Sequence, residues 1–166
     1  KVVILTDKRG HAFKSLGTTV NIHTVKAATL KPGLIAKAFA ATDMMLGILQ
    51  SLQLLKKYKP DVIVGFGGYP SFPGVCAGQL LKIPTILHEQ NAVLGKANVL
   101  LADRAVKIAT SLPDTKGIKP ANQNKVKVTG NPVRASIIAV RDSAYEKPAT
   151  DLRIFITGGS QAAKVF

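Results

Sequence analysis

The sequence predicts an α/β fold in which a parallel sheet is covered by helices on both faces. The first observation is a βαβ unit at residues 60–91, where the apolar runs Val62–Val64 and Thr85–Leu87 flank a glycine-rich turn and a helical segment. Short apolar runs between turn residues are typical of strands buried on both faces, as in parallel sheets. The second observation is that similar runs alternate with helical segments along the chain, which is the pattern of a doubly wound sheet.

The elements before this unit are two strands and a long helix. The apolar run Lys1–Thr6 predicts a strand, and the alternation in Val20–Val25 predicts another, with a short helix expected between them at His11–Gly17. The longest helical pattern runs over Leu34–Tyr58, and a break is expected where Asp43 would cap a second segment.

Within the βαβ unit, Ser71 is the expected N-cap of a helix that ends at Leu81, with Pro73 near its first turn. Residues 112–125 are expected to form a basic loop. The other elements expected after the unit are helix Gly95–Ala102, strand Ala105–Ala109, strand Lys125–Thr129, helix Ala135–Val140 and strand Leu152–Thr157.

The composition divides the chain into three parts. Residues 1–140 form an N-terminal Rossmann-like domain, residues 141–151 a linker, and residues 152–166 the first strand and loop of a second domain. A strand at the first residue and a domain that stops after its first turn predict truncation at both ends. The first strand of a doubly wound sheet is central, so a chain that starts at the second strand would lack the middle of its sheet. The sheet should then show a gap with exposed strand edges, or the flanking strands should draw together.

The charge is strongly positive. The chain has 23 Lys and Arg against 9 Asp and Glu, a net charge of +14, which attracts polyanions. Aromatic residues make up 5%, there is no Trp, and no nucleic-acid motif occurs, so an anionic membrane or a phosphorylated substrate is favoured over nucleic acid. The single cysteine, Cys76, lies in an apolar helix and is expected to be buried in a reducing compartment.

The helix at residues 34–58 supports two interpretations. Apolar residues recur at helical spacing on one face: Met45, Ile48, Leu49, Leu52 and Leu55. This face either packs on the core beside a basic solvated edge, or the apolar first part contacts a membrane surface within a ring of lysines. No stretch has the ~18 uncharged apolar residues needed to cross a bilayer.

Two clusters in the βαβ unit are candidates for chemistry. The glycine turn at Gly65–Tyr69 either serves chain geometry alone or presents N–H groups to an anion. The polar run His88–Asn91 ends a buried strand, so it either forms a network that caps the next helix or carries a general base. His88 is one candidate base, with Glu89 as its orienting partner or as the base itself. Adjacent strand residues point to opposite faces, however, so a dyad is not assumed.

A third cluster follows later strands. Arg134, in the run Gly130–Arg134, is either an exposed helix-start arginine or a clamp for a diphosphate. Ser160 and Gln161 follow the glycines of the last predicted turn, where a hydroxyl and N–H groups would meet the same anion. No metal-ligand spacing accompanies the histidines.

Taken together, these segments resemble one family. KPDVIVGFGGYPSFPG, IPTILHEQNAVLGKAN, VTGNPVR and GGSQAAK, in this order, resemble the MurG family of bacterial UDP-N-acetylglucosamine:lipid I N-acetylglucosaminyltransferases. The resemblance covers nearly all of the chain and is strongest at Lys59–Asn98 and Val128–Arg134. It implies a two-domain GT-B fold whose N-terminal domain binds lipid I and whose C-terminal domain binds UDP-GlcNAc. The C4 hydroxyl of the acceptor would attack the anomeric carbon with inversion, giving lipid II for peptidoglycan, without an obligatory metal or other cofactor.

The resemblance also implies roles for the candidate residues. Those expected around UDP-GlcNAc are Asn91, Arg134, Ser160 and Gln161. Those expected on the acceptor side are Gly67, Gly68 and Tyr69, with His88 and Glu89 as catalytic candidates. The membrane-contacting patch of the family corresponds to residues 34–46, which implies a peripheral enzyme on the cytoplasmic face of the bacterial inner membrane.

Two departures from the family pattern bear on activity. The first glycine-rich loop of the family, with a histidine proposed as the base, would precede residue 1, and Ala162 replaces a glycine in the last turn. With most of the donor domain absent as well, we expect this chain to be inactive alone. Two alternatives remain: another GT-B transferase with a different UDP-sugar or acceptor, and a non-enzymatic basic module that binds a membrane or a polyanion.

Overall fold

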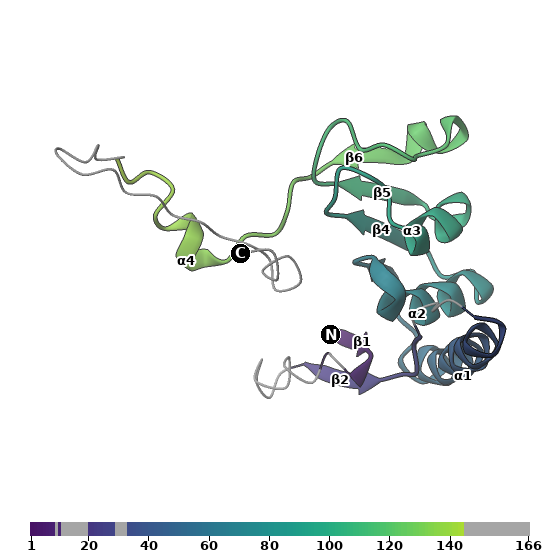
Figure 1. The fold of residues 1–166 in the computed structure, drawn as a ribbon. Helices are drawn as coiled ribbons and strands as arrows, with labels where there is room; N and C mark the ends of the chain where they lie inside the picture. Colours follow the sequence, from purple (N-terminus) through teal and green to yellow (C-terminus); the bar gives the residue numbers. More distant parts are fainter. Residues whose placement is uncertain (9, 11–19, 29–32, 145–166) are drawn as a thin grey trace. The chain divides into compact units, whose positions relative to one another are not determined.

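The computed structural model describes residues 1–8, 10, 20–28 and 33–144 (Figure 1). The chain divides into two compact units, Lys1–Asn131 and Pro132–Phe166, and each is described by itself. The helix expected at His11–Gly17 and the strand expected at Leu152–Thr157 lie outside the described residues.

The strands of the first unit form two parallel sheets. A two-stranded sheet pairs β1 (Val3–Thr6) with β2 (Asn21–Thr24), and Val3 is in register with Asn21. The second sheet has the order β3-β4-β5-β6. Its strands are β3 (Ile63–Gly65), β4 (Thr85–Glu89), β5 (Lys107–Thr110) and β6 (Val126–Val128). All these pairs are parallel, which confirms the predicted fold class.

The two sheets do not pair with each other among the described residues. β1 pairs only with β2, and β3 only with β4, so each leaves one edge without a strand partner. On the same sheet, the apolar side chain of Val64 on β3 is 45% exposed, whereas Leu87 on β4 is fully buried. This arrangement is the first of the two outcomes expected for the sheet, a gap with exposed strand edges.

Helices connect and cover these strands. They are α1 (Leu34–Tyr58), α2 (Gly68–Leu80) and α3 (Lys96–Leu101), followed by the 3₁₀ helices η2 (Ala102–Arg104) and η3 (Pro120–Lys125). α2 contacts α1, α3, β1 and β3. A Cβ at Gly74 would lie 3.7 Å from the side chain of Leu5 on β1, and Gly78 faces Ile63 on β3. The small residues of α2 therefore allow one helix to pack against both sheets. In the second unit, the described helix is α4 (Ala135–Ile138), whose residues are exposed.

The hydrophobic core lies between α2, α3 and the larger sheet. Its buried members are Val75, Leu87, Leu94, Leu101, Ala102, Ala105 and Ile108. Cys76 packs against this cluster while only partly buried. Burial raises the pKa of its thiol, despite the opposing charge effect of Arg104.

Three local predictions are wrong. α2 begins at Gly68 with Gly67 as its N-cap, and Ser71 instead donates its hydroxyl to the Gly68 carbonyl at 3.0 Å. The helix starts earlier because Gly67 and Gly68 adopt φ values of 75° and 69°, which glycine tolerates. Pro73 consequently lies inside the helix, beyond its first turn. α1 is continuous, because Asp43 pairs with Lys26 at 2.9 Å instead of capping a new segment.

The predicted apolar face of α1 is divided: Leu55 packs inward, Ile48 and Leu52 are half-buried, and the rest is exposed. Met45 and Leu49 are 60% and 51% exposed, whereas the buried residues within the described range 36–58 are Ala40, Gly47, Ser51 and Leu55. Gly47 lies directly against the Lys26 carbonyl, so the helix docks through small residues that let backbones approach. Met45 and Leu49 therefore face outward, whereas Leu55 packs inward.

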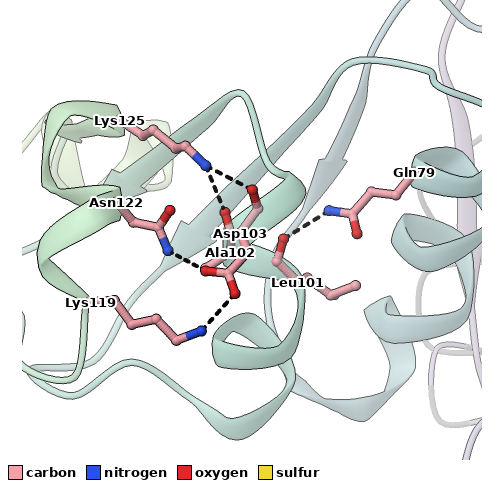
Figure 2. Close-up of polar contacts among 7 residues, drawn as sticks. All are labelled: Gln79, Leu101, Ala102, Asp103, Lys119, Asn122 and Lys125. Atoms are coloured by element: carbon pink, nitrogen blue, oxygen red, sulfur yellow. Dashed lines mark hydrogen bonds and ion pairs between the residues drawn. The ribbon is translucent and has the colours of Figure 1, made fainter.

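A polar network joins the helix ends at the amino-terminal side of β5 and β6 (Figure 2). Its members are Gln79, Leu101, Ala102, Asp103, Lys119, Asn122 and Lys125. Lys125 donates to the carbonyls of Ala102 and Asp103 at 3.3 and 2.9 Å, and the Ala102 carbonyl also accepts from the Ala105 N–H at 3.2 Å. Hydrogen bonds from Lys119 and Asn122 lower the pKa of the Asp103 carboxyl. Residues 112–125, which were expected to form a basic loop, therefore contain η3, and these hydrogen bonds connect η3 to η2.

Candidate functional site

Polar groups gather at the carboxyl ends of the strands in the larger sheet. β4 extends through His88 and Glu89, two residues further than predicted, so both belong to the strand. Gly67 follows β3, Ser111 follows β5, and Gly130 follows β6. Since parallel strands end at one edge, these groups share the edge at which open α/β sheets bind ligands.

Glu89 is a buried carboxylate with four hydrogen-bond donors around it. The side chain is 2% exposed. Oε1 accepts from the Asn91 N–H at 3.1 Å and from the Asn91 amide at 2.8 Å. Oε2 accepts from the Gly95 N–H and from the Asn98 amide, each at 2.8 Å. These donors satisfy the charge that burial would otherwise penalise.

The hydrogen bonds decide the ionisation of Glu89. Burial alone would raise the pKa of this carboxyl, but the bonds from Gly95, Asn98 and Asn91 together lower it below its ordinary value. A carboxylate held in this way is a poor proton acceptor and is largely closed to substrate. The geometry therefore favours Glu89 as the organiser of the loop that carries Asn91, rather than as the catalytic base.

Both ring nitrogens of His88 also have hydrogen-bond partners. Nε2 lies 3.1 Å from the Gly130 carbonyl, and Nδ1 lies 2.8 Å from the Gln90 amide nitrogen. The ring of exposed Phe66 stands against it, with centroids 5.6 Å apart. The side-chain hydrogen bonds of His88 and Glu89 run to separate partners, as expected for adjacent strand residues that face opposite sides.

The glycine turn lies beside this cluster. A Cβ at Gly67 would stand 3.2 Å from the Asn98 amide nitrogen and 3.7 Å from the His88 carbonyl, so a side chain there would crowd β4. Tyr69 is half-buried in the first turn of α2, and that turn contains no acidic residue and no side-chain cap. Its N–H groups and the positive end of the helix dipole are therefore suited to an anion.

Asn98 is a site residue that the sequence reasoning missed. It is 1% exposed, donates to Glu89, and lies 3.4 Å from the His88 carbonyl. Its Oδ1 and the hydroxyl of Thr110 are buried without a hydrogen-bond partner among the described residues. The signal available in the sequence was an asparagine among the apolar residues of helix α3. Burial of an asparagine side chain costs free energy unless it forms hydrogen bonds to another buried polar group.

The remaining predicted site residues do not belong to the described part of the first unit. Arg134 is exposed and belongs to the second unit. Ser160 and Gln161 lie outside the described residues. Over the described ranges, no group of three or more His, Cys, Asp or Glu side chains is placed to hold a metal ion.

The outward face of α1 forms a second surface of interest. Large apolar side chains are exposed on it: Phe39, Met45, Leu46 and Leu49. Lys37, Lys56 and Lys57 of the same helix are exposed too. By length and composition, residues 36–58 would suffice to cross a membrane, with 22% of the most apolar stretch buried. The docking of α1 through Gly47 and Leu55 makes it a helix of this unit with one apolar face left open.

The chain is similar to one family model and to several curated proteins. Residues 1–110 match the description "Glycosyltransferase family 28 N-terminal domain". A UDP-N-acetylglucosamine--N-acetylmuramyl-(pentapeptide) pyrophosphoryl-undecaprenol N-acetylglucosamine transferase of Rhodospirillum centenum is 47% identical over 168 residues, covering 100% of this chain and 44% of the relative. The protein of the same name from Rhodospirillum rubrum is 41% identical over 169 residues, covering 100% of this chain and 43% of the relative. The chain thus spans under half the length of the curated relatives it matches.

Solved structures agree with this similarity. Acinetobacter baumannii MurG superposes with a TM-score of 0.60 at 25% identity, over 85% of this chain and 40% of that one. A UDP complex of MnaA from S. aureus superposes with a TM-score of 0.52 at 15% identity, over 88% of this chain and 49% of that one. The second likeness concerns the fold alone.

Proposed function

The chain belongs to the glycosyltransferase family 28 N-terminal domain family, and on that premise we propose that it is the acceptor-side part of a lipid II-forming transferase. The reaction is transfer of GlcNAc from UDP-GlcNAc to the MurNAc C4 hydroxyl of lipid I, with inversion at the anomeric carbon. The observation that carries this proposal is 47% identity over the whole chain to a transferase of that name. The polar edge of the larger sheet supports it, because it combines an anion-binding turn with a loop anchored on a buried carboxylate.

The glycine turn is assigned to the acceptor. Lipid I carries a diphosphate, and Gly67, Gly68 and Tyr69 begin a helix whose first N–H groups are free of a side-chain cap. A phosphate at this position gains from the N–H donors and from the helix dipole. Substitution of either glycine would force a side chain into a left-handed backbone conformation, since both have positive φ.

The donor is assigned to Asn91, Arg134, Ser160 and Gln161. Asn91 is exposed, and its backbone N–H and its side-chain amide both donate to the buried carboxylate of Glu89. Arg134 supplies a guanidinium that suits the leaving diphosphate, and Ser160 and Gln161 contribute polar donors. Charge-assisted hydrogen bonds of this kind stabilise a departing nucleotide without a metal ion.

A membrane surface is the second partner in this proposal. The acceptor is anchored by a polyprenyl chain, and the outward face of α1 presents Phe39, Met45 and Leu49 beside lysines. Apolar side chains enter the interface while lysines pair with anionic headgroups. We therefore place the protein at the cytoplasmic face of the bacterial inner membrane, bound peripherally through α1. The net charge of +14 suits this location.

The test is transfer of radiolabelled GlcNAc from UDP-GlcNAc to a lipid I analogue by the complete gene product that contains these residues. Asn91→Ala should reduce transfer by at least tenfold, because a charged or well-oriented hydrogen bond is worth ~1.5–3 kcal/mol. Asn124→Ala is the matched control, since Asn124 is an exposed asparagine of η3, at the amino-terminal side of β6. No transfer to lipid I by the folded protein would contradict the proposal, and transfer from a different UDP-sugar would identify another GT-B enzyme.

A further inference from the structure

The partners of His88 define which of its ring nitrogens carries the proton. Nε2 lies 3.1 Å from the carbonyl oxygen of Gly130. A carbonyl oxygen only accepts hydrogen bonds, so Nε2 must be the donor. The opposite tautomer would set two lone pairs against each other at this distance.

Gln90 completes the arrangement at the other nitrogen. Its amide nitrogen lies 2.8 Å from Nδ1 of His88 and 3.5 Å from the carbonyl oxygen of the same residue. A carbonyl oxygen only accepts hydrogen bonds, and this one also accepts from the Asn98 amide at 3.4 Å, so the contact favours the NH₂ group of Gln90, rather than its oxygen, on the side of His88. Nδ1 therefore accepts from Gln90, and both contacts fit the neutral Nε2–H form of the ring. Burial of His88, which is 6% exposed, keeps competing water away from this arrangement.

Gly130, which His88 contacts, lies at the end of the first unit, just before the chain enters the second. The Thr129 N–H donates to the Thr110 carbonyl at 2.9 Å, and the Ser111 hydroxyl donates to Asn131 Oδ1 at 2.5 Å. Between them, Gly130 has a φ of 73° and bonds to His88. Residues 129–131 are thus fastened to the ends of β4 and β5, and the second unit begins at residue 132.

We propose that Gln90 is a positioning residue that holds His88 in its Nε2–H tautomer, so that His88 anchors Gly130 and fixes where the chain leaves the first unit. The significance for catalysis rests on the proposed function: with the Nδ1 lone pair taken by Gln90 and the Nε2 proton given to Gly130, His88 has no free lone pair for the acceptor hydroxyl. His88 then acts through the backbone it holds instead of removing the proton from the C4 hydroxyl.

The test is a long-range ¹H–¹⁵N NMR spectrum of the imidazoles in the ¹⁵N-labelled 166-residue chain. The His88 signals are identified by their loss in a His88→Asn variant. In the unsubstituted chain, His88 should show the nitrogen shifts of the Nε2–H tautomer. Gln90→Met should move its Nδ1 shift toward that of a tautomer mixture and change the backbone amide shifts of residues 129–131.

Two further variants keep the test decisive. Gln123→Met makes the same substitution at an exposed glutamine of η3 and should leave the His88 shifts unchanged. If Gln90→Met fails to fold, Gln90→Asn retains the amide on a side chain one methylene shorter and should shift His88 in the same direction. An Nδ1–H tautomer in the unsubstituted chain, or His88 shifts that are indifferent to Gln90, would overturn the proposal. No UDP-sugar or lipid enters this measurement, so its failure and a failure of the transferase assignment are distinguishable.

Discussion

Replacement of Glu89 by Gln should destabilise the first unit strongly, although the two side chains have nearly the same shape. The carboxylate accepts four hydrogen bonds from Asn91, Gly95 and Asn98. An amide has one acceptor oxygen, and its NH₂ group would face two of these donors. Two donors next to a side chain that is 2% exposed would then lack an acceptor. At ~1–3 kcal/mol for each buried unsatisfied group, the expected loss in free energy of unfolding is about 2–6 kcal/mol.

The assay is urea denaturation followed by far-ultraviolet circular dichroism at neutral and acidic pH. Since the folded-state pKa of Glu89 is lowered, its stabilising contribution is complete above the ordinary carboxyl pKa and is lost as the pH falls through the folded value. The difference between Glu89→Gln and the unsubstituted chain should therefore narrow on acidification. Asp114→Asn, which neutralises an exposed carboxylate, should change the free energy of unfolding by under about 0.5 kcal/mol. A Glu89→Gln chain as stable as the unsubstituted one at neutral pH would refute the reasoning.

Three other substitutions test separate parts of the fold and surface. Lys125→Met removes two hydrogen bonds to the carboxyl end of η2 and should lower the free energy of unfolding by ~1–2 kcal/mol, whereas Lys127→Met on the exposed part of β6 should not. Phe39→Glu should weaken binding to vesicles of anionic phospholipid. Leu100→Glu, on α3 and with the same 70% exposure, should leave this binding unchanged. Equal losses of binding in the two variants would show that α1 is not the membrane contact. Gly47→Ala should destabilise the protein despite alanine's advantage of ~1 kcal/mol in helices, because the added methyl meets a backbone carbonyl; higher stability in thermal unfolding would show that α1 does not dock there.

The sequence was sufficient to locate the edge of the sheet where polar groups gather, because turn residues and polar residues mark the ends of its strands. Buried apolar runs that stop at glycines or at His88–Asn91 mark the carboxyl ends of parallel strands, and topology then places those ends together. The separate orientations of His88 and Glu89 also follow from the period of two in a strand. Both features depend on local pattern: the structure confirms that these polar groups share one edge and that the two side chains have separate partners, while their role in a functional site stays a prediction.

What the sequence did not predict depends on contacts between distant segments. The four donors of Glu89 come partly from the loop and partly from Asn98 on the next helix, so the carboxylate could not be recognised as an anchor from its neighbours alone. The periodicity of α1 identified a real apolar face but left core packing and membrane contact open, because nothing in the pattern shows that Gly47 meets a backbone carbonyl. Likewise, Ser71 has the chemistry of an N-cap, but two glycines with positive φ start the helix before it.

The most direct test of the account is a titration of the ¹⁵N-labelled chain with a water-soluble lipid I analogue that carries a short prenyl chain, followed by amide NMR shifts. Saturable shifts are expected at Gly67, Gly68 and Tyr69, with smaller changes at the network around Asp103 on the opposite edge. Inorganic diphosphate should perturb the same three amides more weakly, since it supplies the anion without the sugar. Shifts confined to the Asp103 network, or no shift at the glycine turn at saturating analogue, would contradict the assignment of this edge to the acceptor.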